Sequence, residues 1–141
     1  MVMRSSDAEW RGDLKSGKGS MRLGSGAFEG SYSFPSRFES GQGTNPEELI
    51  AAAHAGCFSM AFSHGLASAG HTPTSVRTTA RLHLEQAGGG FAITRIELDC
   101  QAEVPGIDEA AFNKLADEAK KGCPVSKALA GTEITLNARL A

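Results

Sequence analysis

The sequence predicts a single α+β domain, because strand-like segments come before and after two helical regions without a regular strand–helix alternation. Residues 8–39 alternate short strand-like segments with turns rich in Gly, Ser and Lys. A long uncharged helix follows, and segments of alternating polarity at 74–104 and 133–140 enclose a second helical region. This order is typical of α+β proteins and not of a doubly wound parallel sheet. No stretch resembles a linker, so we expect one domain over residues 1–141.

The N-terminal part predicts a small β-meander. Turn residues at 15–19 separate its first two strands, and the Gly-rich stretch at 40–43 predicts a flexible loop after the third. The expected strands are Ala8–Leu14, Ser20–Leu23 and Ser31–Phe38.

The segment 44–49 has the features of a helix start. It places a polar cap residue, Pro46 at a first helical position and two acidic residues in the first turn. We expect the helix to run to Ala69 and to end at Gly70.

No charged residue occurs between Leu49 and Gly70, over a length that could cross a bilayer. Ala and Gly dominate this run, and two His and three Ser residues make it only weakly hydrophobic. A buried helix therefore fits better than a membrane span, and we expect no membrane partner.

The C-terminal half predicts an antiparallel sheet covered by helices. The apolar phase of its second strand changes from odd to even positions, which indicates a β-bulge near Thr94–Arg95. Asp108 is the expected cap of the longer helix, and Gly122 its end. The expected strands and helices are 74–84, 91–104, 108–122, 124–130 and 133–140.

Composition restricts the partners and the compartment. The net charge of −2 gives no basic excess that would bind a phosphate backbone, so nucleic acid is not expected as a partner. The three cysteines are an odd number, and the N-terminal stretch MVMRSSDAEW lacks a secretory apolar segment. We therefore expect a cytoplasmic protein with reduced thiols.

Two cysteines are candidates for chemistry. Cys57 lies among small helix residues, where a cysteine is commonly a buried small hydrophobe. Cys123 precedes Pro124 at a helix start, where free N–H groups lower the pKa of a thiol. Local sequence therefore predicts that Cys123 is the more acidic thiol. Cys100 shares a strand face with apolar residues and is expected in the core.

His54 lies three residues before Cys57, so the two side chains share a helix face and could bind zinc together. No further ligand pair of suitable spacing accompanies them, and no glycine loop opens a helix to hold a phosphate. We therefore expect no metal and no cofactor. His54 could bias the Cys57 thiol, but packing is the favoured interpretation.

Two charged residues precede the long helix or begin it. Asn45 and Glu48 match a capping box, which leaves Glu47 without a capping role. Glu47 lies nearly three helical turns before Cys57, too far for contact along its own helix. Arg37, in the segment FPSRFE, could form an exposed Arg–Glu surface pair.

Three segments, 44–62, 91–108 and 120–129, resemble the OsmC/Ohr family of thiol peroxidases. The likeness extends over the chain from Trp10. HAGCFSMA, TPTS at 72–75 and SRFE at 36–39 are more similar to the OsmC branch than to the Ohr branch, where a tyrosine commonly replaces His54. That variation favours leaving the histidine out of the chemistry.

The resemblance implies an OsmC-like fold in an intertwined homodimer, with the long helix buried centrally and each active site at the subunit interface. It implies that Cys57 attacks the hydroperoxide and that Cys123 resolves the product. Arg37 would hold the Cys57 thiolate, and Glu47 would position the guanidinium. Which subunit supplies the arginine and the glutamate stays open. An external dithiol of lipoyl or thioredoxin type would reduce the pair.

The expected function is reduction of organic hydroperoxides, and more weakly of hydrogen peroxide, in oxidative or osmotic stress defence. Phe58 and Met60 are the expected apolar lining that favours alkyl substrates. One alternative is a non-catalytic stress protein whose dimer pocket holds an apolar ligand. A second is a thiol redox sensor that passes oxidation to a partner.

Overall fold

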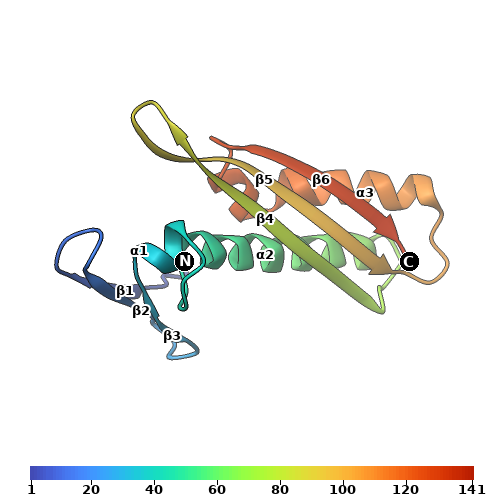
Figure 1. Cartoon of the computed structure of the whole chain (residues 1–141). Coiled ribbons are helices and arrows are strands. Elements are labelled where there is room, and N and C mark those ends of the chain that lie inside the picture. The colour runs from blue at the N-terminus through green and yellow to red at the C-terminus, as the bar shows by residue number, and fades with distance from the viewer. The chain divides into compact units, whose positions relative to one another are not determined.

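The computed structural model describes residues 1–141, and they form two compact units, Met1–Leu49 and Ile50–Ala141. Each unit contains one three-stranded sheet, with strand orders β1-β2-β3 and β4-β5-β6 (Figure 1). The α+β class is therefore confirmed. The expectation of one domain stays a prediction.

The first unit is the expected β-meander, in which both strand pairs are antiparallel. Trp10 and Tyr32 pack over Gly19 with ring centroids 5.2 Å apart. A Cβ atom on Gly19 would come within 2.6 Å of both rings, so only glycine fits between them. The strands are β1 (Ser6–Arg11), β2 (Lys18–Leu23) and β3 (Glu29–Tyr32).

The third strand is shorter than predicted, because the residues after Tyr32 form the helix α1 (Phe34–Phe38). A capping box starts this helix: the Ser33 hydroxyl accepts the N–H of Ser36 at 3.2 Å, and the Ser36 hydroxyl accepts the N–H of Ser33 at 2.8 Å. A proline in the first turn suits the helical φ angle. The prediction of a strand over 31–38 is therefore wrong beyond residue 32.

The other elements lie close to their predicted positions. Gly70 follows the long helix with a φ of +90°, a backbone conformation that glycine adopts without strain. The Asp108 carboxylate accepts the N–H of Ala111 at 2.7 Å and caps the next helix as predicted. These elements are α2 (Pro46–Ser68), β4 (Ser75–Ala87), β5 (Gly90–Glu103), α3 (Glu109–Gly122), α4 (Pro124–Ala128) and β6 (Glu133–Leu140).

The predicted bulge is confirmed. His83 pairs with Arg95 and Leu84 pairs with Ile93, so Thr94 is the extra residue on β5. Beyond this point the even-numbered residues of β5 turn toward the core.

The second sheet is mixed, which corrects the expectation of an antiparallel sheet. β4 and β5 are antiparallel, whereas β6 runs parallel to β5. The helices α3 and α4 lie between β5 and β6 in the sequence, and they provide the long crossover that a parallel pair requires.

The helices α2 and α3 run side by side across one face of this sheet (Figure 1). Phe62 of α2 contacts Phe112 of α3, with ring centroids 5.2 Å apart. Cys100 is fully buried, which confirms its predicted place in the core. The core residues of this unit are Phe58, Phe62, Leu66, Ile96, Leu98, Cys100, Ala102, Val104, Phe112, Ala116, Ala119 and Cys123.

Only one face of α2 is buried within the chain. Its opposite face exposes small residues such as Ala52 and Gly56, together with Met60, which is 75% exposed. By length and composition alone α2 could cross a membrane, with a mean hydropathy of 1.2. Three of its large apolar side chains, Phe58, Phe62 and Leu66, however, pack into the core with β5 and α3, as in a core helix.

Replacing Phe62 by alanine should destabilise the protein by about 3–5 kcal/mol, because the ring joins α2 to α3 and is fully buried. Urea unfolding at one fixed protein concentration measures the change. Lys114→Ala, on the exposed side of α3, is the control and should stay within about 0.5 kcal/mol. Equal losses in both variants would contradict the central position of Phe62.

Candidate active site

The structure brings Cys57 and Cys123 together although they are 66 positions apart in the sequence. Both thiols are free, and their sulfur atoms lie 2.8 Å apart. Cys57 is on the middle of α2, and Cys123 joins α3 to α4. Its backbone N–H donates to Ala119 O at 2.9 Å and so fixes the residue at the end of α3. A bond between the sulfurs therefore requires only a small local movement.

The two thiols differ in acidity. Burial raises the pKa of Cys57, and the hydrogen bond between the sulfurs raises it further. Burial also acts to raise the pKa of Cys123, but that hydrogen bond, the N–H groups of Ser126 and Val125 and the Ser126 hydroxyl together lower it. The sequence-based expectation that Cys123 is the more acidic thiol agrees with these directions.

The two thiols also differ in access. Cys123 has no exposed surface, whereas Cys57 is partly exposed. A reagent that approaches this pair meets Cys57 first. Acidity and accessibility are therefore divided between the two residues.

Arg37 and Glu47 form a forked ion pair within the first unit. The Arg37 Nη2 atom donates to Glu47 Oε1 at 2.8 Å, and its Nε atom donates to the two carboxylate oxygens at 3.0 and 3.3 Å. Glu47 is only 8% exposed, so the arginine is the counter-charge of a buried carboxylate. The Arg–Glu pair is therefore exposed only on its arginine side, because its carboxylate is buried.

Hydrogen bonds between α1 and the start of α2 place this pair. The Ser36 hydroxyl donates to Thr44 O at 2.8 Å, and the Asn45 side chain donates to Ser36 O at 3.0 Å. Asn45 caps α2 as predicted, since its side-chain oxygen accepts the N–H of Glu48 at 2.8 Å. The Glu48 carboxylate instead accepts the Thr44 hydroxyl at 3.2 Å, so the returning half of the predicted capping box is absent.

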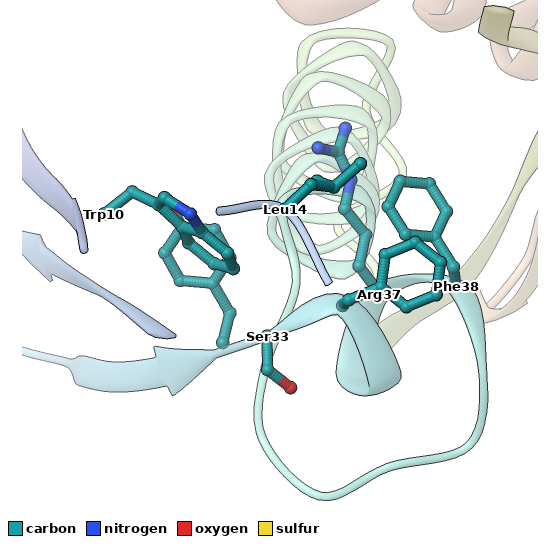
Figure 2. A pocket seen from close by; sticks show the side chains of 7 residues that line it. Trp10, Leu14, Ser33, Arg37 and Phe38 are labelled. Atoms are coloured by element: carbon teal, nitrogen blue, oxygen red, sulfur yellow. The ribbon is translucent and has the colours of Figure 1, made fainter. Parts of the chain in front are cut away.

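Arg37 borders a hollow of about 190 Å³ in the first unit. Figure 2 shows Trp10 at one end of this hollow and Arg37 and Phe38 at the other. The guanidinium carbon lies 5.2 Å from the centroid of the Phe38 ring. Besides these three residues, the lining residues are Leu14, Tyr32, Ser33 and Phe34.

The predicted apolar lining does not include Phe58, and the part of it assigned to Met60 stays a prediction. Phe58 has no exposed surface because it packs into the core of the second unit, and Met60 is 75% exposed on the opposite face of α2. The helix has apolar or small residues on every side, so its sequence does not indicate which face meets the core.

A buried polar pair lies beside the thiols. The His54 Nε2 atom is 2.6 Å from the Ser126 hydroxyl, and the two residues are 0% and 5% exposed. Burial lowers the pKa of His54. Sequence reasoning missed Ser126, and for His54 it favoured packing over an effect on the Cys57 thiol. Their spacing was the available signal, since they stand three residues before Cys57 and three residues after Cys123.

No three side chains of His, Cys, Asp or Glu converge as metal ligands do. His54 is directed to Ser126 rather than to a shared site with Cys57.

Comparisons with known proteins identify the family. The family model described as "OsmC-like protein" matches residues 39–138. The chain belongs to this OsmC-like family.

Individual relatives give the same result. The chain is 50% identical to the "Peroxiredoxin OsmC" of Escherichia coli K12, over 99% of this chain and 97% of the relative. It is 37% identical to an "Organic hydroperoxide resistance protein" of Xanthomonas axonopodis pv. citri, over 68% of this chain and 67% of that protein. A solved structure of an organic hydroperoxide resistance protein OsmC from Legionella pneumophila superposes with a TM-score of 0.75 and 23% identity, over 99% of each chain, which supports the OsmC-like fold.

Glu47→Gln should cost about 1–3 kcal/mol of stability, because it removes the charge that the Arg37 guanidinium contacts through two nitrogen atoms. Arg37 is partly exposed, so the lower part of this range applies. The neighbouring Glu48→Gln is the matched control and should cost at most about 0.5 kcal/mol. Urea unfolding of both variants checks the difference, and a larger loss in Glu48→Gln would refute this account of the ion pair.

Proposed function

We propose that this protein is a cysteine-based peroxidase that reduces organic hydroperoxides, and hydrogen peroxide more weakly, in stress defence. The observation that carries the proposal is the thiol pair, in which a reachable Cys57 lies 2.8 Å from a buried Cys123. The names of the relatives, a peroxiredoxin and an organic hydroperoxide resistance protein, support the same class of reaction.

Cys57 makes the first attack. Although Cys123 is the more acidic thiol, it has no exposed surface, and a thiolate that peroxide does not reach does not react. The Cys57 sulfur attacks the terminal oxygen of R–O–O–H, the O–O bond breaks, and the alcohol leaves with a proton. The products are the Cys57 sulfenic acid and ROH.

A cation is needed to make Cys57 a thiolate, because burial raises its pKa. Arg37 has this role in the proposal, supplied by the same or the partner subunit. Glu47 bonds to the Nε and Nη2 atoms of Arg37, and Nη1 is not among the bonded atoms. The guanidinium is thus oriented from one edge, and its other edge can donate to the sulfur and to a peroxide oxygen.

Cys123 resolves the oxidised thiol. Its sulfur attacks the sulfenic sulfur, an S–S bond forms, the S–O bond breaks, and the hydroxyl leaves as water with one proton. An external dithiol of lipoyl or thioredoxin type then supplies two electrons and two protons by thiol–disulfide exchange. No metal or other cofactor takes part in the proposal.

The substrate class follows from the hollow beside Arg37. Four aromatic side chains, Trp10, Tyr32, Phe34 and Phe38, line it. An alkyl or aryl group would gain by leaving water there, whereas hydrogen peroxide has no such group. Organic hydroperoxides are therefore the preferred substrates in the proposal.

An intertwined homodimer, formed by one domain per chain in a reducing cytoplasm, completes the proposal. The exposed face of α2 supports it, because this uncharged face carries small residues and Met60. In the proposal, this surface packs closely against a second copy of the same helix. The second copy would cover the exposed face, so that α2 would be buried centrally in the dimer as expected.

Cys57→Ser should abolish the consumption of cumene hydroperoxide in the presence of a regenerating dithiol, because it removes the attacking sulfur. Cys100→Ala is the matched control and should keep the activity, since Cys100 is a fully buried core thiol with a raised pKa. Peptide mapping of the peroxide-treated wild type should reveal a Cys57–Cys123 bridge. Equal activity of Cys57→Ser and wild type would disprove the proposal, and absence of the bridge would favour a non-catalytic ligand-binding protein.

Arg37→Ala should raise the pKa of Cys57 by about one unit or more, because it removes the proposed cation while the effect of burial remains. Thiolate absorbance at 240 nm, measured against pH in the Cys123→Ser and Cys100→Ala background, gives this pKa. Arg37→Lys keeps the positive charge but loses the forked hydrogen bonds. The pKa of Cys57 in this variant should therefore lie between those of the parent protein and of Arg37→Ala. An unchanged pKa in Arg37→Ala would show that another group activates Cys57.

A further inference from the structure

A buried polar pair, His54 and Ser126, lies next to Cys123 in the fold. His54 on α2 contacts the Ser126 hydroxyl on α4 at 2.6 Å, and Ser126 stands one helical turn after Cys123. The Ser126 hydroxyl is also among the groups that lower the pKa of the Cys123 thiol. Both His54 and Cys123 have no exposed surface, so solvent does not compete for the His54–Ser126 hydrogen bond.

The direction of the hydrogen bonds follows from the histidine. Burial keeps its ring neutral, and a neutral ring has one N–H donor and one acceptor nitrogen. The Nδ1 atom is buried without a hydrogen-bond partner. Because orphaned buried N–H groups are rarer than orphaned acceptors, the proton belongs on Nε2. The Nε2–H group then donates to the Ser126 oxygen, which leaves the hydroxyl hydrogen for Cys123.

We propose that His54 and Ser126 are positioning residues that hold the Cys123 sulfur as a hydrogen-bond acceptor, ready to attack the oxidised Cys57. The inference rests on the proposed function, and it adds a role for two residues that the peroxide itself does not contact. It also explains why a polar histidine with one orphaned nitrogen is retained in the core.

The chain of donors acts on the resolving step. Two donors in series favour the negatively charged form of the Cys123 sulfur, which is the nucleophile for the sulfenic sulfur. The thiol proton lost by Cys123 balances the proton that the departing hydroxyl gains to form water. Neither His54 nor Ser126 is oxidised or reduced, so the step needs no additional reactant.

The surrounding titratable groups are few. Cys57 faces Cys123 from α2, together with His54 through Ser126. The ammonium groups nearest in the sequence are Lys120, Lys121 and Lys127, at the end of α3 and on α4. Lys121 pairs with Asp117 at 2.7 Å on the exposed side of α3. The lysines are therefore left unchanged in the experiment, so that only the donor chain varies.

The test measures the Cys123 thiol directly, without peroxide. In the Cys57→Ser and Cys100→Ala background, Cys123 is the remaining thiol, and absorbance at 240 nm against pH gives its pKa. His54→Leu and Ser126→Ala should each raise this pKa by about one unit. His54→Gln and Ser126→Thr keep a donor at the same place and should leave it near the parent value. Circular dichroism confirms the fold of each variant, and Ser126→Ala, which removes one oxygen, serves if His54→Leu does not fold.

A second measurement follows the reaction with peroxide in proteins that keep both Cys57 and Cys123. Trapping with dimedone should show sulfenic acid forming on Cys57 at the wild-type rate, while the bridge forms about tenfold more slowly at neutral pH in His54→Leu and Ser126→Ala. Equal Cys123 pKa values in Ser126→Ala and the parent would overturn the inference. Failure of the peroxidase proposal would appear separately, as absence of sulfenic acid in every variant.

Discussion

The contact between Cys57 and Cys123 is the constraint on which the rest of the structure depends. It holds the middle of α2 against the junction of α3 and α4, two segments that the sequence separates by 66 positions. The aromatic contact between Phe62 and Phe112 keeps the two helices at this distance. The parallel strand β6 closes the unit by pairing with β5 after both helices have crossed the sheet (Figure 1).

The environment of the pair explains why two cysteines are used. A thiol that accepts hydrogen bonds from N–H groups and a hydroxyl becomes acidic, but the groups that do this also enclose it, as they do Cys123. Cys57 stays reachable and has fewer such donors, so that burial raises the pKa of its thiol despite the backbone N–H of Val125. In the proposed mechanism, attack is therefore suited to the accessible Cys57, and resolution to the more acidic but buried Cys123.

Much of this arrangement could be predicted from the sequence, because it depends on local signals. The helix start at Pro46, the stop at Gly70 and the bulge at Thr94 each follow from a few neighbouring residues. The direction of β6 could not be predicted, since a parallel strand and an antiparallel strand show the same alternation. The partner of His54 could not either, because Ser126 lies 72 positions away and hydroxyls three residues from a cysteine are common.

The Arg37–Glu47 pair places a charge at the start of α2, whose remaining length after Glu48 has no charged residue. Glu47 compensates the guanidinium and so reduces the positive potential available to a thiolate, which argues against the pairing as a device for activation alone. Its fork, however, engages only the edge formed by Nε and Nη2 and fixes the plane of the group. The guanidinium that Glu47 orients therefore has a weaker positive potential but a fixed plane. In the proposed mechanism the fixed plane matters more, because the two oxygens of a peroxide must align with the attacking sulfur. In the proposed mechanism, a lone arginine of equal charge would hold the thiolate but would not select the peroxide oxygen that the thiolate attacks.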